Sequence, residues 1–210
     1  MSSVEESVPS PRKRANANRS RILDAAMRCF AANSDASMDD VAKAAGVVRR
    51  TVYAHFPNRD ALVEGLADEA GTALAASVEQ PEPEDADVAL AVGVLRLSPV
   101  GDRYRVLLSF ARKEVGEERI AELIAPVRTH TCGVVERGRA AGVFSAYLPT
   151  VVLVGMMEGL TMATLEQANH GVVDDASRAM ALGVLVLAGV TPDRAAEVVA
   201  SAQRWLHARA

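Results

Sequence analysis

The chain has 210 residues, half of them apolar, which is enough to bury the core of one ordinary domain and one smaller domain. Its net charge is −4 and only 4% of its residues are aromatic, a composition rich in small aliphatic residues that favours an all-α protein. The apolar runs at 151–165 and 180–190 are too short or too interrupted to span a bilayer, and the first twenty residues lack an apolar signal segment. We therefore expect a cytoplasmic protein with no membrane partner.

Charge is unevenly distributed along the chain. Residues 12–59 contain 10 Lys and Arg against 4 Asp and Glu, a net charge of +6. Residues 60–210 contain 13 against 21, a net charge of −8. A basic segment joined to an acidic one indicates a DNA-binding head on a body with a different task.

The first segment, residues 1–18, is rich in Ser, Pro, Asn and Arg and poor in apolar residues. This composition predicts a disordered basic arm. The arm either contacts phosphates or a minor groove or is a solvated tail, and the sequence leaves both interpretations open.

Residues 19–60 contain the strongest motif, two short helices joined at a glycine. Ser37 can cap a helix over 38–45, and Gly46 can adopt the left-handed backbone that ends it. In the second helix Val52 and Phe56 anchor one face, which leaves Arg49, Arg50, Thr51 and Tyr53 for solvent or a polyanion. This spacing predicts a helix-turn-helix, which places side chains in the major groove of DNA.

The same residues resemble a known family. The helix from residue 19 to 32, then SMDDVAKAAGV, TVYAHF and PNRDALV, together resemble the N-terminal domain of TetR/AcrR family bacterial transcriptional regulators over residues 19–65. Val48 stands where that family typically carries a capping Ser or Thr. The resemblance implies a role in DNA binding for five residues: Arg49, Arg50, Tyr53, His55 and Arg59. Thr51, which lies beside them on the same helix, and Ser37, at the start of the preceding helix, complete the predicted DNA-binding set.

These residues have different expected roles. By resemblance, Arg49 and Arg50 contact base edges or nearby phosphates, and an arginine suits the O6 and N7 of guanine. Tyr53, His55 and Arg59 match backbone-contacting positions, while Ser37 can present its helix N-terminus to a phosphate. The alternatives are a solvated face for the arginines, partial burial for Tyr53 and a structural hydrogen bond for His55.

Residues 61–210 form the predicted body. Helical patterns interrupted by Gly or Pro lie at 58–79, 86–97, 102–115, 118–141, 149–169, 174–189 and 192–208. With the head, this predicts about ten helices and no strands.

Two helices of the body carry strips of small residues. Gly155, Gly159 and Ala163 follow at four-residue steps, and Ala179 and Gly183 repeat the pattern on the next helix. The resemblance implies that this pair packs against its two-fold mate as a four-helix bundle, forming a homodimer. The alternative is that both strips pack inside one chain.

The opposite side of the first of these helices is a candidate effector site. Helical geometry turns Val154, Met157, Thr161 and Thr164 towards the interior, where methionine and sparse hydroxyls suit an apolar or amphipathic small molecule. Neighbouring helices could complete the wall with Phe110, His130, Val134 and Phe144. Residue by residue, all of them also fit an ordinary core.

The expected function is a sequence-specific DNA-binding transcriptional regulator. We expect a repressor released from a near-palindromic double-stranded operator by a small-molecule effector; the alternatives are an activator or an effector-independent DNA-binding protein with a structural body. We find no convincing nucleophile with its base, phosphate loop or paired carboxylates, so no enzyme activity or cofactor is expected. His130 and Cys132 are two residues apart on a helix and diverge, so no metal site is expected.

Overall fold

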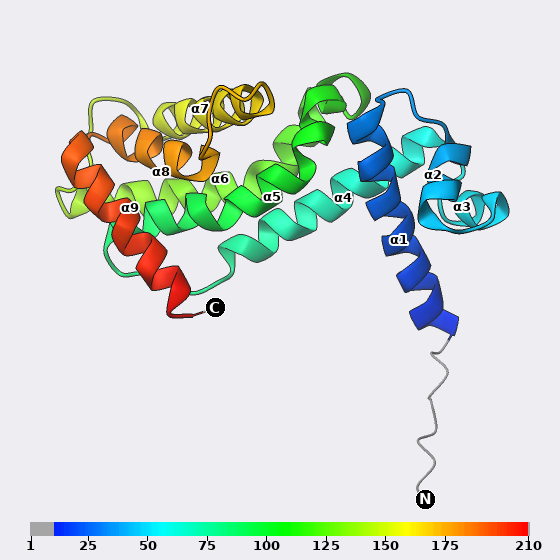
Figure 1. Cartoon of the computed structure of the whole chain (residues 1–210). Helices are drawn as coiled ribbons and strands as arrows, with labels where there is room; N and C mark the ends of the chain where they lie inside the picture. The colour runs from blue at the N-terminus through cyan, green and yellow to red at the C-terminus, as the bar shows by residue number, and fades with distance from the viewer. Residues whose placement is uncertain (1–10, 210) are drawn as a thin grey trace, which may run out of the picture.

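The computed structural model describes residues 11–209, with side chains described at 15–104 and 115–209. This part of the chain contains nine α-helices and no strand, as the composition predicted (Figure 1). The helices are α1 (Pro11–Ala32), α2 (Met38–Ala45), α3 (Arg49–His55), α4 (Arg59–Val78), α5 (Ala86–Glu114), α6 (Glu117–Ala140), α7 (Thr150–Asn169), α8 (Ala176–Leu187) and α9 (Pro192–His207).

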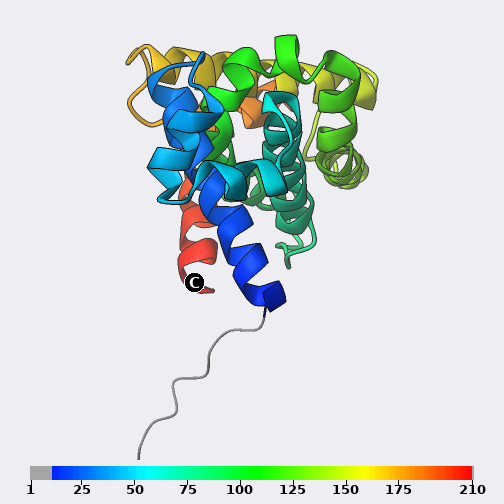
Figure 2. The same ribbon diagram turned by 90° about the vertical axis from the view of Figure 1, so that its right-hand side faces the viewer.

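The helices form a head and a body. Helices α1, α2 and α3 gather at one end of the molecule, and α6 to α9 lie at the other (Figures 1 and 2). Helices α4 and α5 run side by side between the two ends (Figure 1). The chain thus places the predicted DNA-binding segment apart from the predicted effector-binding segment.

The start of the head differs from the prediction. α1 begins at Pro11, so residues 11–18, which we expected to be disordered, are helical. Pro11 suits the first helical position because its ring presets φ and its missing N–H has no partner there in any helix. Residues 1–10, the rest of the predicted arm, lie outside the described residues.

Helix α5 also differs from the prediction. We expected a break at Ser98 and Pro99, but one helix runs through them. A proline inside a helix costs about 3 kcal/mol or more, because it removes a hydrogen bond and crowds the preceding turn. Packing on both sides outweighs this cost: Leu90 and Val92 are buried in the body core, and Tyr104 is buried in the head core. Ser98 is itself buried and hydrogen-bonds Ser177 of α8.

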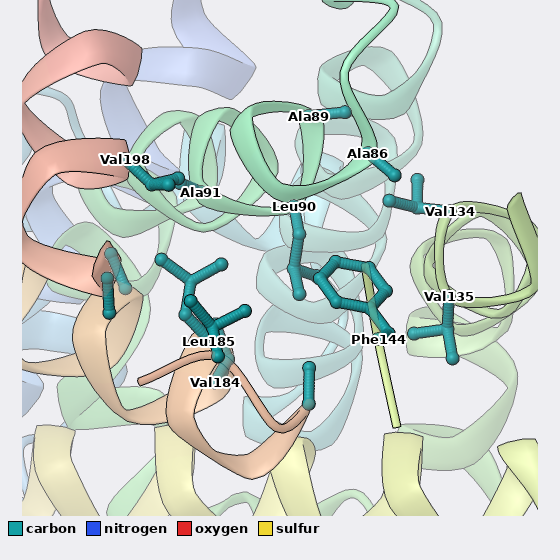
Figure 3. Close-up of a cluster of buried hydrophobic side chains, with 14 of the residues drawn as sticks. Ala86, Ala89, Leu90, Ala91, Val134, Val135, Phe144, Val184, Leu185 and Val198 are labelled. Atoms are coloured by element: carbon teal, nitrogen blue, oxygen red, sulfur yellow. The ribbon is translucent and has the colours of Figure 1, made fainter. Parts of the chain in front are cut away.

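The body has a largely aliphatic core of buried side chains, and Phe144 is part of it. This residue lies in the loop after α6, and its ring points between Leu90 of α5 and Val135 of α6 (Figure 3). The loop is pinned by the Phe144 amide, which donates to the Gly138 carbonyl at 3.1 Å. The Ser145 amide also donates to the carbonyl of Ala188, at the end of α8, at 2.8 Å. These contacts tie α5, α6 and α8 together.

Candidate nucleic-acid interface

The geometry of the predicted helix-turn-helix follows from local capping. Ser37 and Asp40 form a reciprocal capping box: the Asp40 amide donates to Ser37 Oγ at 3.2 Å, and the Ser37 amide donates to Asp40 Oδ2 at 3.0 Å. The same pairing lowers the pKa of the Asp40 carboxyl, because the hydrogen bonds from Ser37 favour its charged form. Gly46 ends α2 with φ of 64°, in the left-handed region that glycine adopts without strain.

α3 is held on the head by its apolar side. Val52 and Phe56 are buried in the head core, as predicted. Val48 precedes the helix with an extended backbone, makes no side-chain cap, and is 69% exposed. The opposite face therefore presents Val48, Arg49 and Arg50 to the outside.

Arg49 has defined partners on the surface of the head. Its Nη1 lies 2.9 Å from Oδ2 of Asp39 on α2, and its Nη2 lies 3.3 Å from the hydroxyl of Tyr53. The guanidinium carbon is 5.2 Å from the centre of the Tyr53 ring. The hydrogen bond to Tyr53 and the charge of Asp39 both raise the pKa of Arg49. Arg49 and Tyr53 are thus brought together on one exposed face.

The other predicted residues of α3 differ in exposure. Arg50 is exposed and makes no hydrogen bond or ion pair with any of the described residues. Thr51 and His55 are half-buried, and the His55 ring lies tilted beside Phe56 with 6.4 Å between ring centres.

Arg59 plays a structural part that the sequence did not reveal. Its Nη1 donates to the carbonyl of Ala36 at 2.9 Å, and its Nη2 donates to the carbonyl of Ser34 at 2.6 Å. Its guanidinium carbon also lies 4.4 Å from the centre of the Phe30 ring. Arg59 therefore fixes the loop between α1 and α2, which accounts for an arginine at this position without a phosphate contact.

Sequence reasoning missed two further residues that shape the head. Asn58 caps α4, because its Oδ1 accepts the Ala61 amide at 2.8 Å. Arg21 donates to the Ala45 carbonyl at 2.7 Å and so satisfies the end of α2. The Asn before a helical run is a readable capping signal, whereas the Arg21 contact joins residues 24 positions apart and leaves no local pattern.

The candidate effector residues with described side chains lie in or beside the body core. Val134, Phe144, Val154 and Met157 are buried there. The hydroxyls of Thr161 and Thr164 donate to carbonyls one turn earlier in α7, at 2.9 and 2.8 Å. His130 is half-buried on α6, with Nε2 3.0 Å from a carboxylate oxygen of Glu82. Four of the predicted residues thus pack as core, and the two threonines satisfy their hydroxyls within α7.

The remaining candidate, Phe110, has its side chain outside the described residues. A hollow of about 450 Å³ lies elsewhere, where residues 173–177 meet Asp102 of α5 and Ala168 of α7. It contains none of the predicted effector residues.

The candidate dimer residues fall into two groups. Gly155, Gly159 and Ala163 are exposed on α7, and nothing in the described chain would touch a Cβ added at either glycine. On α8, Ala179 is half-buried, and Gly183 packs against Leu160 of α7, whose Cδ1 would lie 2.7 Å from an added Cβ. The absence of a side chain at Gly183 thus lets α8 pack closely on α7 of the same chain. This is the packing expected at Gly183 if its strip packs inside one chain.

The α7 face is also apolar beyond its glycines. Val151, Val152 and Met156 are 72%, 45% and 43% exposed, next to Gly155 and Gly159. Contiguous exposed apolar surface of this kind marks an interaction site more often than isolated exposed residues do.

Two further kinds of site are not found in the described part of the chain. No three His, Cys, Asp or Glu residues gather there in a way that could hold a metal ion. None of the described helices has the length and apolar character needed to cross a membrane.

The basic head and its paired short helices define a helix-turn-helix DNA-binding protein, and comparison with known proteins agrees. Residues 22–66 match the family described as "Bacterial regulatory proteins, tetR family". The HTH-type transcriptional repressor LfrR of Mycolicibacterium smegmatis is 39% identical over 70 residues, which is 33% of this chain and 37% of the repressor. The matched region thus spans little more than a third of that relative's length.

Solved structures extend the likeness to the body. The structure of LfrR from Mycobacterium smegmatis in complex with proflavine is 25% identical, covers 81% of this chain and 96% of that one, and has a TM-score of 0.62. The fatty acid degradation regulator FadR from Bacillus halodurans is 19% identical with a TM-score of 0.70, covering 87% and 97%. RolR in complex with resorcinol is 17% identical with a TM-score of 0.59, covering 90% and 95%. Residues 22–66 thus form an N-terminal domain of the TetR family, and the whole chain shares the fold of these regulators.

Proposed function

We propose that the chain is a homodimeric repressor that binds a near-palindromic operator and is released from it by a small molecule. The observation that carries the DNA-binding part is the exposed face of α3, where Arg49, Arg50 and Tyr53 stand together on a basic head. Lysine and arginine supply affinity through phosphates, while contacts to base edges supply sequence choice. The half of the proposal that concerns repression is supported by the likeness to the repressor LfrR.

The dimer is supported by the open α7 face. Gly155 and Gly159 have free space beside them, and Val152 and Met156 are exposed next to them. A second copy could bury this face about a two-fold axis and present two α3 helices to one side of the DNA. Such an arrangement requires half-sites about 34 to 36 Å apart, one turn of the double helix.

The path from body to head is supported by two sets of ion pairs on α4. Arg119 of α6 lies 2.8 Å from Glu64 and 2.6 Å from Asp68. Arg103 of α5 lies 2.9 Å from Glu69 and 2.8 Å from Asp24 of α1. Exposed pairs add little stability, about 0 to 1 kcal/mol each, so the link rests mainly on the packing of α4 along α5 and α6, and the ion pairs fix its register.

Release by a small molecule is supported by proflavine and resorcinol in the similar structures. A ligand can shift the equilibrium only if it binds one body shape more tightly than the other. Because Val134, Phe144, Val154 and Met157 are packed together here, a ligand among them would have to separate these side chains. The body shape that binds such a ligand would then differ from the close-packed one, as release requires.

The burial of these four candidate effector residues in the body core also favours a second candidate, an effector-independent DNA-binding protein whose body only dimerises. The two candidates differ in one measurement. An effector raises the melting temperature of the first and lowers its operator affinity, whereas no small molecule does both to the second.

The experiment that tests DNA binding is fluorescence anisotropy with the intergenic DNA beside the gene and with scrambled DNA, at several salt concentrations. We expect specific binding that weakens with salt and is lost in an Arg49→Ala, Tyr53→Ala double variant. Equal affinity for both DNAs would contradict the proposal. Proflavine and resorcinol are then the first probes in a thermal-shift and anisotropy screen.

A further inference from the structure

Asp39 stands out because it places a negative charge on the surface that would face DNA. It is the second residue of α2, and its Oδ2 lies 2.9 Å from Nη1 of Arg49, the first residue of α3. A carboxylate near phosphates opposes binding through its charge. Its position therefore calls for a role other than affinity.

Helix capping does not supply that role. The capping box of α2 is completed by Ser37 and Asp40, so Asp39 is not needed to satisfy the helix N-terminus. An acidic residue in the first turn does gain about 0.3 to 1 kcal/mol from the helix dipole, but Asp40 supplies such a charge as well. The second oxygen of Asp39, Oδ1, is covered and has no hydrogen-bond partner among the described residues. The directed interaction of this carboxylate is thus with Arg49.

Asp39 and Tyr53 together fix the Arg49 guanidinium from two sides. Asp39 bonds Nη1, and the Tyr53 hydroxyl bonds Nη2 while its ring lies beside the guanidinium. A free arginine side chain has about 2 kcal/mol of rotamer entropy to lose on binding. Arg50 has no such partners in the described part of the chain and keeps that freedom.

The fixed guanidinium still has donors to offer. It carries five N–H groups, of which one on Nη1 and one on Nη2 are used here. One N–H on each of these nitrogens, and that of Nε, are left over. A guanine presents two acceptors, O6 and N7, on its major-groove edge, and arginine binds them in pairs. The remaining donors of Arg49 match that requirement.

We propose that Asp39 is a positioning residue that holds the Arg49 guanidinium for recognition of one guanine in each operator half-site. This inference rests on the proposed function, because it assumes that α3 enters the major groove. Asp39 then lowers affinity for DNA in general and raises discrimination at one base pair. It acts through Arg49 and touches no base itself.

The test compares the wild type with Asp39→Asn on an operator in which each base pair is substituted in turn. A good paired contact to guanine is worth roughly 5- to 150-fold in affinity against the wrong base. Discrimination is the ratio of affinities for the operator with guanine and with another base at one position. We expect Asp39→Asn to lower this ratio at least threefold at one guanine in each half-site and to leave it unchanged at the other positions. Affinity for unrelated DNA should stay equal or rise.

Three controls separate positioning from charge and from folding. Asp60→Asn removes the same charge from the exposed first turn of α4 and should leave discrimination unchanged. In an Arg49→Ala background, Asp39→Asn should have no further effect at that guanine. Circular dichroism and thermal melting confirm that each variant retains the fold.

The outcomes are distinct. If Asp39→Asn tightens binding to operator and unrelated DNA by the same factor, Asp39 only competes with DNA for Arg49, and the inference is wrong. If discrimination falls equally in Asp60→Asn, the effect is one of charge, and the inference is again wrong. If the wild type binds no DNA specifically, the proposed function fails and this inference with it.

Discussion

The role of Phe144 can be decided by truncation, because the pocket interpretation and the core interpretation predict different results. In the structure the ring is only 5% exposed and packs among Leu90, Val134 and Val135 (Figure 3). Removing such a ring in Phe144→Ala costs about 3 to 5 kcal/mol of unfolding free energy. For a chain of this size that corresponds to a drop of roughly 6 to 20 °C in melting temperature, at about 2 to 4 °C per kcal/mol.

A partner substitution sharpens the test. A Cβ at Gly138 would overlap the Phe144 ring. In Gly138→Ala this overpacking should lower the free energy of unfolding by about 1 to 3 kcal/mol. The higher helix propensity of alanine should offset up to about 1 kcal/mol of that loss. In the double variant Gly138→Ala, Phe144→Ala the overlap disappears. Its loss of unfolding free energy should therefore be at least about 1 kcal/mol smaller than the sum of the losses in the two single variants.

The assay is urea unfolding followed by circular dichroism, with matched effector-binding measurements once a ligand is identified. A loss below about 1 kcal/mol in Phe144→Ala, together with lost effector binding, would refute the core interpretation. It would show that the ring lines a site that tolerates empty space.

Three further predictions concern the head, the dimer and the pH dependence of stability. Val48→Thr supplies the missing cap of α3 and should stabilise the head by about 1 kcal/mol in urea unfolding; no gain would mean that the extended Val48 backbone does not place the hydroxyl for capping. Met156→Lys puts a charge on the exposed α7 face and should convert the proposed dimer to a monomer in sedimentation velocity, whereas Val48→Thr should leave the mass unchanged. Burial, aided by the charge of Glu69, raises the pKa of Tyr104 to about 12, so the folded state holds this proton more tightly than the unfolded chain. The associated stability is complete below about pH 10 and should be lost between about pH 10 and 12, by roughly 3 kcal/mol. An equally steep loss in Tyr104→Phe would contradict this assignment.

The head was predictable where signals are local. Ser37 with Asp40 three residues later, and Gly46 after an apolar stripe, each fix a helix end through neighbouring backbone groups. Both helix ends are found where these residues placed them. The missing cap at Val48 was also readable, and the structure shows no substitute side-chain cap.

Contacts between distant residues were not predictable. The phosphate contact expected of Arg59 stays a prediction, whereas its bonds to carbonyls 23 and 25 positions earlier in the chain had no local signal. From the sequence, Asp39 is an ordinary acidic residue in the first turn of a helix. Only the structure shows that Arg49, ten positions later, lies beside it. Helical periodicity correctly predicted that Val154 and Met157, opposite the glycines of α7, face the interior. Periodicity does not tell whether that interior is filled or contains a cavity.

Pro99 is a strong local signal that tertiary packing overrides, and it lies where α5 passes from the body to the head. On one side of it α5 belongs to the body core, and on the other Tyr104 belongs to the head core. α5 therefore joins the two parts alongside α4, and Arg103 adds ion pairs to both α1 and α4. If the head turned about α4 alone, Tyr104 would leave the head core, at a cost of roughly 1.5 to 3 kcal/mol for exposing a large side chain. Gly101 and Asp102, shortly after Pro99, still face α7 and the start of α8, so the body as well as the head holds this part of α5. The proline, which leaves one helical hydrogen bond unmade, is the point at which α5 bends most easily.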